Sequence, residues 1–254
     1  MKKLFKFILN TIPRPFLIKI SYWVRPLISF FLKGTTFTDP IDSKSFRFFL
    51  PYGYGAQRSN ALSPSTLSLE RHRLLWLYLK NETDFFSTPK KVLHIAPEQC
   101  FIKLFKKQKN LEYITADLHS PIADVKADIC YLPFEENMFD VVFSNHVLEH
   151  IEDDAKAMSE LFRVLKPGGM GIFQIPQDLS RENTYEDFSI ISSEERAKHF
   201  GQYDHVRIYG KDYFNRLRKV GFTVNEIDYS KTISEDLVKK YCLTKGEILP
   251  VCFK

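Results

Sequence analysis

The sequence predicts an α/β fold built around a mostly parallel β-sheet. The main observation is that short apolar runs typical of buried strands alternate with helix-like segments from residue 68 to residue 175. The second is composition, because 44% hydrophobic and 26% charged residues in a chain of 254 are typical of a globular protein with a sizeable core. This length corresponds to one large or two small domains. No internal repeat or low-complexity tract interrupts the pattern.

Residues 1–33 form the first of three predicted parts, a basic and aromatic helical extension. They carry seven Lys or Arg residues and no acid, which leaves a net charge of −2 on the rest of a chain whose total is +5. A basic body that would bind nucleic acid is therefore excluded. Charges and prolines leave no uncharged run of the roughly 18–20 residues that a membrane span needs. Two or three short helices in a membrane interface fit this composition. Helices docked on the rest of the chain or on a second subunit are the alternative.

Residues 34–66 form the second part, which we expect to be a loop-rich lead-in. Two proline-centred turns, Asp39-Pro40-Ile41-Asp42 and Ser63-Pro64-Ser65-Thr66, bracket an aromatic stretch. They resemble paired zinc knuckles in which every cysteine has been replaced, and Asp, Ser and Thr cannot form a tetrahedral thiolate site. Elsewhere the four cysteines never fall in a C-x-x-C pair. The sequence therefore predicts no metal site and reduced thiols in a cytoplasmic protein, peripheral at the inner face of the membrane.

Residues 67–254 form the third part, the α/β domain, and its first half has clear element signals. A helix is expected to start at Ser68 as its cap, with Glu70 in the first turn, and to continue to Lys80. The apolar runs that follow predict a strand at 90–96, a basic helix at 101–107, a strand at 111–116 ending at Asp117, and a short strand at 124–127. The connection after Asp117 is too short for a crossover helix, so we expect the edge of the sheet to be trimmed there.

The second half of the domain continues the alternation. It predicts a fully buried strand at 139–144, an amphipathic helix at 154–165, a strand at 170–175, a helix ending at Gly221, and two last strands at 223–228 and 247–254. Between 176 and 209 lies a long, densely polar connection, a length typical of a lid or a substrate pocket. A solvated surface segment with a helix at 193–199 is the alternative interpretation.

The chemistry-bearing signal is the order of four motifs. Asp117 ends the second strand 23 residues after His94, where a carboxylate can accept hydrogen bonds from both hydroxyls of a ribose. The segments ADICYLPFEENMFDVVFSNHVLEHI and LFRVLKPGGMGIFQIP follow. Together these features resemble the class I S-adenosylmethionine-dependent methyltransferases of the type 11 group. The resemblance implies a Rossmann-like seven-stranded sheet in the order 3-2-1-4-5-7-6, with the last strand antiparallel, helices on both faces, and S-adenosylmethionine as cofactor.

The resemblance also implies roles for individual residues. Asp117 would hold the ribose hydroxyls, Asp128 would hold the adenine amine, and Asn145 with His146 would line the methionine end of the cofactor. The full set of expected cofactor-binding residues is His94, Ala96, Glu98, Asp117, Leu118, Asp128, Ile129, Asn145, His146 and Arg71. We expect Glu149 to face solvent or a basic partner.

One feature departs from the family pattern. Class I methyltransferases usually have a glycine-rich loop after the first strand, whereas this chain has His94-Ile95-Ala96-Pro97-Glu98-Gln99-Cys100. Glu98 offers a partner for the cationic amino group of the cofactor, and Arg71 or Arg73 for its carboxylate. The loop leaves three hypotheses: an altered functional site, a different ligand, or an inactive site.

The long connection supplies the candidates for acceptor contact, which are His199, Tyr203, Asp204 and Arg207. A general base is needed only for an acceptor that is protonated at its working pH, and His205, with His150 second, is the candidate. The function predicted is methyl transfer to a small-molecule or lipid-linked acceptor. The alternative is a catalytically silent methyltransferase-like binding or scaffold protein at a membrane surface.

Overall fold

The computed structural model describes residues 24–53 and 57–254. The chain divides into two compact units, the first formed by Met1–Leu77 with Ile233–Thr244 and the second by Tyr78–Thr232 with Lys245–Lys254. The division lies inside helix α3 (Glu70–Glu82) and not at residue 67, where the sequence placed it.

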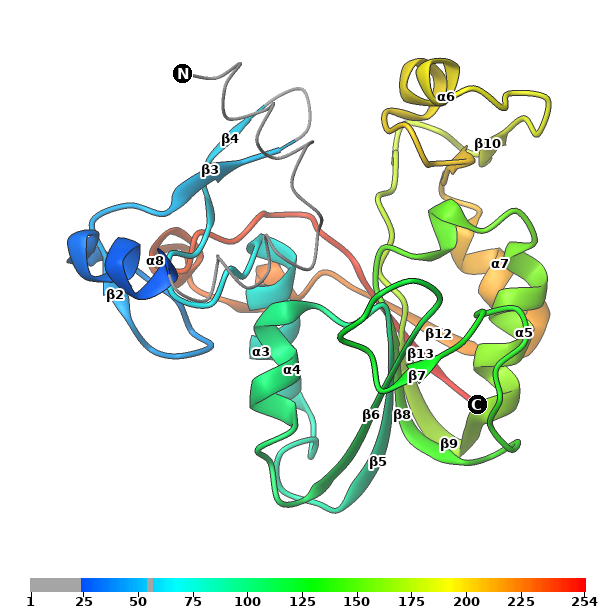
Figure 1. The fold of residues 1–254 in the computed structure, drawn as a ribbon, viewed down its shortest axis with the longest axis horizontal. Helices are drawn as coiled ribbons and strands as arrows, with labels where there is room; N and C mark the ends of the chain where they lie inside the picture. The colour runs from blue at the N-terminus through cyan, green and yellow to red at the C-terminus, as the bar shows by residue number, and fades with distance from the viewer. Residues whose placement is uncertain (1–23, 54–56) are drawn as a thin grey trace. The chain divides into compact units, whose positions relative to one another are not determined.

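The second unit contains the seven-stranded sheet, which runs in the order β12-β13-β9-β8-β5-β6-β7 (Figure 1). The strands are β5 (Lys90–Ile95), β6 (Leu111–Asp117), β7 (Val125–Lys126), β8 (Phe139–Ser144), β9 (Leu165–Ile172), β12 (Thr223–Ile227) and β13 (Leu249–Phe253). The strands from β9 to β7 pair in parallel, and β13 is antiparallel to both of its neighbours. Numbered by chain order, this is 3-2-1-4-5-7-6, so the predicted topology is confirmed.

Helices pack on both faces of this sheet, each face through a layer of apolar side chains (Figure 1). Helix α4 (Gln99–Phe105) covers one face, and α5 (Asp154–Val164) packs with α7 (Tyr213–Val220) on the other. The residues of β5 alternate between these layers. Leu93 and Ile95 belong to the core that includes Leu161 and Leu217, whereas the ring of His94 packs among aromatic rings on the α4 side. The chain after β6 reaches β7 without a helix, as the short connection predicts.

The long connection after β9 folds into a small subdomain of its own. Strands β10 (Tyr185–Glu186) and β11 (Arg207–Ile208) pair antiparallel around helix α6 (Ser193–Phe200). The hydroxyl of Ser192 caps α6 by accepting from the N–H of Glu195, and Gly201 ends the helix at a φ of 83°. The subdomain stands beyond the carboxyl ends of the parallel strands (Figure 1). Two short 3-10 helices lie elsewhere in the same unit: η1 (Leu148–His150) precedes the subdomain in the chain and η2 (Tyr229–Thr232) follows it.

In the first unit, residues 34–66 are more ordered than the loop-rich lead-in expected from the sequence, because residues 33–62 include two antiparallel strand pairs. These are β1 (Lys33–Thr38) with β2 (Ser45–Phe46), and β3 (Leu50–Tyr52) with β4 (Arg58–Leu62). The strands are short and interrupted by register shifts, so they leave little alternation in the sequence. Helix α8 (Glu235–Lys240) contacts β1.

Buried hydrogen bonds join the two proline-centred turns of this unit. Asp39 is fully buried and accepts from the hydroxyl of Thr66 and from Ser68 Oγ at 3.0 Å. The expected capping role of Ser68 is wrong, because α3 begins at Glu70 and Ser68 is not the residue directly before it; the Ser68 hydroxyl donates to Asp39 instead. The guanidinium of Arg73 donates to the carbonyls of Ala61, Ser68, Tyr241 and Cys242, which attaches residues 241–242 to the start of α3.

Residues 24–31 are helical, as the sequence predicts for this end of the extension, and residues 1–23 lie outside the described part. Large apolar side chains on this helix are exposed, with Phe30 and Phe31 at 72% and 71%. No helix within residues 24–53 and 57–254 has the length and apolar character to cross a membrane.

Candidate functional site

A buried polar network joins the carboxyl ends of β5 and β8. His94 is fully buried, with Nδ1 2.8 Å from the hydroxyl of Tyr113 and Nε2 2.5 Å from Glu98 Oε2. Asn145 Nδ2 donates to Glu98 Oε1 at 3.2 Å, and Asn145 Oδ1 accepts from the N–H of Gln174. The structure thus brings together three of the predicted cofactor-binding residues. Their contacts are internal, so this network fixes the floor of the site.

The loop that replaces the glycine-rich motif keeps one glycine-like feature. Ala96 has a φ of 48°, in the left-handed region that glycine adopts without strain. Its N–H donates to the carbonyl of Ala116 on β6. Glu98 is the residue preceding α4, but its side chain makes no capping hydrogen bond to the helix and turns to His94 and Asn145 instead. A tight strand-to-helix turn therefore persists without the glycines.

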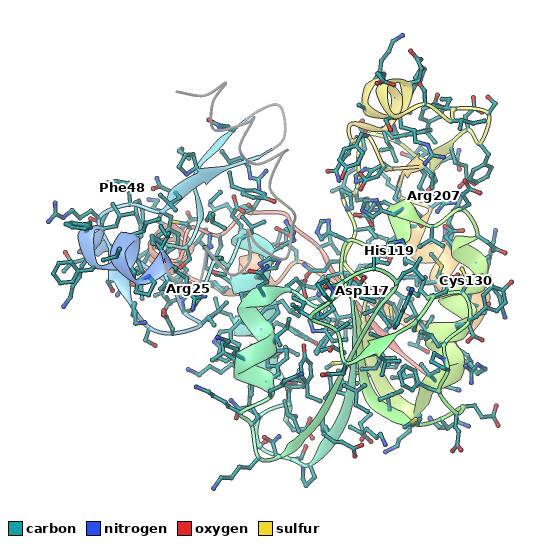
Figure 2. The ribbon with its side chains drawn as sticks, viewed as in Figure 1. Arg25, Phe48, Asp117, His119, Cys130 and Arg207 are labelled. Carbon is teal, nitrogen blue, oxygen red and sulfur yellow. The ribbon has the colours of Figure 1, made fainter. Side chains whose placement is uncertain are left out.

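Two acidic residues follow the neighbouring strands β6 and β7. Asp117 ends β6, and its Oδ1 accepts from the backbone N–H groups of His119 at 2.7 Å and Ser120 at 2.5 Å. Figure 2 labels Asp117 and His119 at this end of the sheet. Asp128 is held similarly, with Oδ1 accepting from the N–H of Cys130 at 2.9 Å. Backbone donors therefore fix the orientation of both carboxylates before any ligand binds.

The hydrophobic residues predicted beside these acids differ from one another in exposure. Leu118 is exposed next to Asp117. Ile129 is buried in the main core, and Cys130 next to it is only partly buried. Burial raises the pKa of the Cys130 thiol to about 11, with Asp128 contributing in the same direction. A flat ring bound by Asp128 would therefore meet Leu118 or Cys130 more readily than Ile129.

Sequence reasoning missed two residues at the ends of the central strands. Ser144 ends β8 and Gln174 follows β9, and both are buried. Ser144 Oγ and Gln174 Oε1 have no hydrogen-bond partner among the described residues. Buried polar atoms are nearly always paired, so two unpaired ones at this edge are consistent with a polar ligand. No pattern in the sequence marks them.

Further along the chain, His146, Glu149 and His150 lie on one turn with His205 beside them. His146 Nδ1 is 3.3 Å from Glu149 Oε1, and the rings of His150 and His205 are 4.8 Å apart at 82°. Of the two expectations for Glu149, exposure to solvent is wrong, because its side chain is only 1% exposed, and the basic side chain that it contacts is His146. Burial lowers the pKa of His205, although Glu149 raises it, and the net shift is downward. His205 is therefore neutral at pH 7.

Arg207, expected to contact the acceptor, is used within the protein. It is fully buried, and its guanidinium donates to the carbonyls of Leu148, Ile151 and Glu152 and to Glu186 at 2.9 Å. Figure 2 shows Arg207 where the subdomain meets the rest of this unit. Arg207 therefore positions the η1 turn that carries Glu149 and His150.

The remaining acceptor candidates lie in the subdomain at different distances from this cluster. Asp204 contacts His150, through its carbonyl at 3.1 Å and its carboxylate at 3.5 Å from Nδ1. Tyr203 is exposed. His199 pairs with Tyr185 and Glu195 on α6. Asp204 alone among these three touches a predicted catalytic residue in the described structure.

Arg71 belongs to the first unit and the other predicted cofactor-binding residues to the second. Its Nε is buried and lacks a hydrogen-bond partner in the described part of the chain. Arg73, the alternative, is occupied by backbone carbonyls. The guanidinium of Arg73 is thus not free to bind the cofactor carboxylate.

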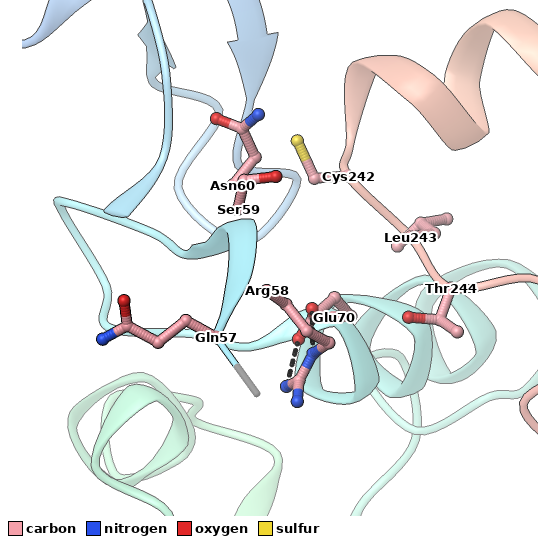
Figure 3. A pocket seen from close by; sticks show the side chains of 8 residues that line it. All are labelled: Gln57, Arg58, Ser59, Asn60, Glu70, Cys242, Leu243 and Thr244. Carbon is pink, nitrogen blue, oxygen red and sulfur yellow. Dashed lines mark hydrogen bonds and ion pairs between the residues drawn. The ribbon is translucent and has the colours of Figure 1, made fainter. Parts of the chain in front are cut away.

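The first unit contains an open polar pocket that includes none of the predicted site residues. It is lined by Gln57, Arg58, Ser59, Asn60, Glu70, Cys242, Leu243 and Thr244 (Figure 3). An ion pair between Arg58 and Glu70, with Nε 2.9 Å from Oε1, crosses it. Burial raises the pKa of Cys242 to about 11, so its thiol is not a reactive thiolate at pH 7.

Comparison with known proteins bears on the same segment as the geometry. Residues 81–173 match the type 11 family model described as a methyltransferase domain. This match covers β5 to β9, including Asp117, Asp128 and Asn145. The segment is a class I methyltransferase domain. The family assignment predicted from the motifs is confirmed, and with it S-adenosylmethionine as the cofactor.

Individual relatives match shorter stretches of the methyltransferase domain. A 2-phytyl-1,4-naphtoquinone methyltransferase of Nostoc punctiforme is 31% identical over 116 residues, 41% of this chain and 50% of its own length. A sterol 24-C-methyltransferase of Schizosaccharomyces pombe is 32% identical over 127 residues, 49% of this chain and 32% of its own. The chain therefore spans half or less of the length of these two relatives.

Among solved structures, an S-adenosylmethionine-dependent methyltransferase of Mesorhizobium loti aligns with 71% of this chain and 98% of its own, at 14% identity and a TM-score of 0.46.

Proposed function

We propose that the protein transfers a methyl group from S-adenosylmethionine to a small, apolar or lipid-linked acceptor. The observation that carries the proposal is the placement of Asp117 and Asp128 after adjacent strands of a sheet with this strand order, inside the segment that matches the methyltransferase family. In open α/β sheets, ligands bind at the carboxyl ends of the strands near the point where strand order reverses. Here that point lies between β5 and β8.

The residues at this edge fit the cofactor. Asp117 would accept from the ribose hydroxyls, since backbone donors hold its Oδ1 and orient the carboxylate. Asp128 would accept from the adenine amine. The unpaired oxygens of Ser144 and Gln174 supply acceptors for the cationic amino group. Glu98 supports Asn145 from beneath and adds negative charge near that end.

The chemistry requires alignment more than proton transfer. When bound, S-adenosylmethionine supplies an electrophilic methyl group attached to a sulfonium sulfur. The protein's task is to orient the acceptor atom in line and to exclude water. The subdomain of residues 176–209 stands beyond the strand ends and carries His205 to the side of His150. A neutral His205 can accept a proton from a hydroxyl acceptor at pH 7.

Two observations favour an apolar acceptor met at a membrane surface. The relatives named above act on a phytyl naphthoquinone and on a sterol, according to their names. The helix at 24–31 exposes Val24, Leu27, Phe30 and Phe31. An exposed apolar patch of this kind marks an interaction site, and the basic charge of residues 1–33 suits an anionic lipid surface.

Isothermal calorimetry with S-adenosylmethionine and S-adenosylhomocysteine tests the proposal. We expect saturable binding of both ligands by the full chain, and a loss of about 1.5–3 kcal/mol in Asp117→Ala, the range for hydrogen bonds to a charged group. Glu112→Ala is the matched control, because Glu112 is an exposed carboxylate on the same strand, in its first half. No binding by the wild-type protein favours the alternative function, a silent scaffold. Equal affinity in a folded Asp117→Ala variant removes Asp117 from the site.

A further inference from the structure

We infer that Glu149, His150 and His205 form a binding site for a divalent transition-metal ion. Each offers one ligand atom, and these three atoms lie within 4.8 Å of one another. One carboxylate and two imidazoles form a ligand set that Zn²⁺ and Fe²⁺ take in proteins. An ion about 2.0–2.2 Å from each of these ligands holds them about 3.4 Å apart in tetrahedral geometry, so the three atoms need to approach one another by about 1.4 Å at most.

The state of Glu149 is independent evidence for a ligand. Its side chain is 1% exposed, and its Oε2 has no hydrogen-bond partner among the described residues. Its other oxygen has His146 Nδ1 at 3.3 Å. An unpaired carboxylate oxygen in the interior is strongly unfavourable unless a cation or a donor compensates it. A metal ion bound with the two histidines is that cation.

The two histidines have the lone pairs that the ion requires. His150 Nδ1 faces the carbonyl oxygen and the carboxylate of Asp204, at 3.1 and 3.5 Å. Both are acceptors, so Nδ1 carries the proton and the lone pair of the neutral ring is on Nε2. A carbonyl or carboxylate on the second ring nitrogen is the usual support of a metal-binding histidine. His205 stands edge to face with His150, at 4.8 Å between ring centroids.

The backbone holds these ligands in place although they come from distant parts of the chain. The N–H of Val206 donates to the carbonyl of Glu149 at 2.9 Å, which joins the two ligand-bearing segments directly. Arg207 binds the carbonyls on either side of His150. Ligands fixed by their own support bind a metal with little reorganisation. The expectation that the chain has no metal ligands reflected the absence of a short-range spacing motif, since His205 is 55 residues from His150.

A site with three protein ligands leaves coordination positions open. Resting on the proposed function, we assign these positions to an oxygen of the acceptor, because the cluster adjoins His146 at the end of β8. The ion would orient a hydroxyl acceptor and lower the pKa of its oxygen, as Lewis-acid metals do. With His205 as a ligand, the lowered pKa of the acceptor oxygen replaces the proton-acceptor role proposed for His205 above: the acceptor hydroxyl loses its proton to solvent as it binds, before the methyl transfer from which water is excluded. Acceptors with a hydroxyl or phenol group are the class that this site selects.

Metal titration of the full chain, without cofactor or acceptor, tests the site independently of methyl transfer. After removal of metals with a chelator, Co²⁺ is added and its visible d–d absorption is followed, and Zn²⁺ binding is measured by calorimetry. We expect one ion per chain and an affinity at least 10-fold weaker in His205→Ala and in Glu149→Gln. His119→Ala, which removes an imidazole outside the cluster, should bind as the wild type does. Excess Mg²⁺ should not displace Co²⁺, because Mg²⁺ prefers oxygen ligands.

Several results overturn the inference. The first is no metal binding above background by the wild-type chain. The others are a His205→Ala variant that binds the metal as tightly as the wild type, a His119→Ala variant that loses as much affinity as His205→Ala, and displacement of Co²⁺ by Mg²⁺. Glu149 is buried and its variant can fail to fold, so His205→Ala, at the more accessible ligand, decides the matter if circular dichroism shows that variant folded. Metal binding without S-adenosylmethionine binding supports this inference while contradicting the proposed function, and the reverse outcome separates them equally well.

Discussion

Glu98 contacts two buried side-chain nitrogens at once, one with each carboxylate oxygen. One carboxylate oxygen faces His94 Nε2 at 2.5 Å and the other accepts from Asn145 Nδ2 at 3.2 Å. An amide at this position has one acceptor for two donors. Glu98→Gln should therefore lower the free energy of unfolding of the ligand-free protein by about 1–3 kcal/mol, the cost of one unpaired buried group. Urea denaturation measures this change.

Exposed Glu112→Gln is the control for Glu98→Gln and should change the free energy of unfolding by less than about 0.5 kcal/mol. A ligand-free protein unaffected by Glu98→Gln, with weaker S-adenosylmethionine binding, would instead mean that Glu98 meets the cofactor directly, as the sequence suggested. The contacts with His94 and Asn145 favour the first outcome.

Ala96 holds a left-handed conformation that a glycine adopts freely. The strain of an L-residue there is about 1–2 kcal/mol, partly offset by the greater unfolded-state entropy of glycine, about 0.5–1 kcal/mol. Ala96→Gly should raise the free energy of unfolding by up to about 1 kcal/mol. Ala155→Gly, at an exposed position in α5, should lower it by about 1 kcal/mol or less. An Ala96→Gly variant that is destabilised as Ala155→Gly is contradicts the argument.

The predictability of the site differs from residue to residue. Asp117 is the last residue of β6 and Asp128 is the second residue after β7, so the local pattern predicts their places at the sheet edge. Glu149 was misplaced because its burial depends on β11, which the sequence places more than 50 residues away. The partners of Glu98 depend on the pairing of β5 with β8, which no local spacing encodes.

At the scale of elements, the subdomain is attached to α5 and α7 by partly buried ion pairs. Glu186 on β10 pairs with Arg207 at 2.9 Å and Arg216 at 2.8 Å, and Arg216 also pairs with Asp154. Burial raises the pKa of Glu186, but hydrogen bonds from Arg216 and Arg207 outweigh it and leave this pKa below its ordinary value of 4.5. The carboxylate is therefore favoured by folding.

This shift sets the pH dependence of the subdomain. A group whose folded pKa is lowered contributes stability that is present above its unfolded pKa and is lost as the pH falls through its folded pKa. Glu186→Gln should lower the unfolding free energy by about 1–3 kcal/mol at pH 7. The difference from wild type should shrink as the pH falls below about 4.5. Chemical denaturation at a series of pH values measures both.

Glu182→Gln is the control for this series. Glu182 is 74% exposed and pairs with Lys211 at the surface, so its loss should cost less than about 1 kcal/mol at any pH. A difference between Glu186→Gln and wild type that is independent of pH would show that shape, and not charge, holds β10 in place.

Element prediction succeeded where a segment is long and either uniformly buried or periodic. The strand at 139–144 and the helix at 154–165 agree with β8 and α5 to within a residue. The short strands β1 to β4 were missed because two to six residues with register shifts give no usable period. Their positions depend on contacts within the first unit, such as those of Asp39, that the local sequence does not reveal.

At the scale of the whole molecule, residues 1–33 remain outside the chemistry that the second unit explains. Deletion at residue 33 is a poor test of their role, because Lys33 belongs to β1 and the carbonyl of Leu32 accepts from Arg47. Substitution of exposed side chains leaves these backbone contacts intact. Phe30 and Phe31 are suitable because about seven-tenths of each is exposed, so their loss should not unfold the unit.

Co-sedimentation with vesicles, with and without anionic lipid, tests peripheral attachment. The full chain should bind anionic vesicles, and high salt should weaken binding only in part, since apolar side chains add a salt-insensitive contribution. Phe30→Ser with Phe31→Ser should reduce partitioning at least 10-fold, because burying each ring contributes about 1.5–3 kcal/mol. Ile191→Ser, at an exposed apolar residue of the subdomain, should bind as the wild type does. If the full chain ignores vesicles, or if the double variant binds undiminished, the exposed helix at 24–31 does not attach the protein to lipid. The docked-helix alternative then stands, and a self-association measurement on the same double variant would show whether a second copy covers the helix.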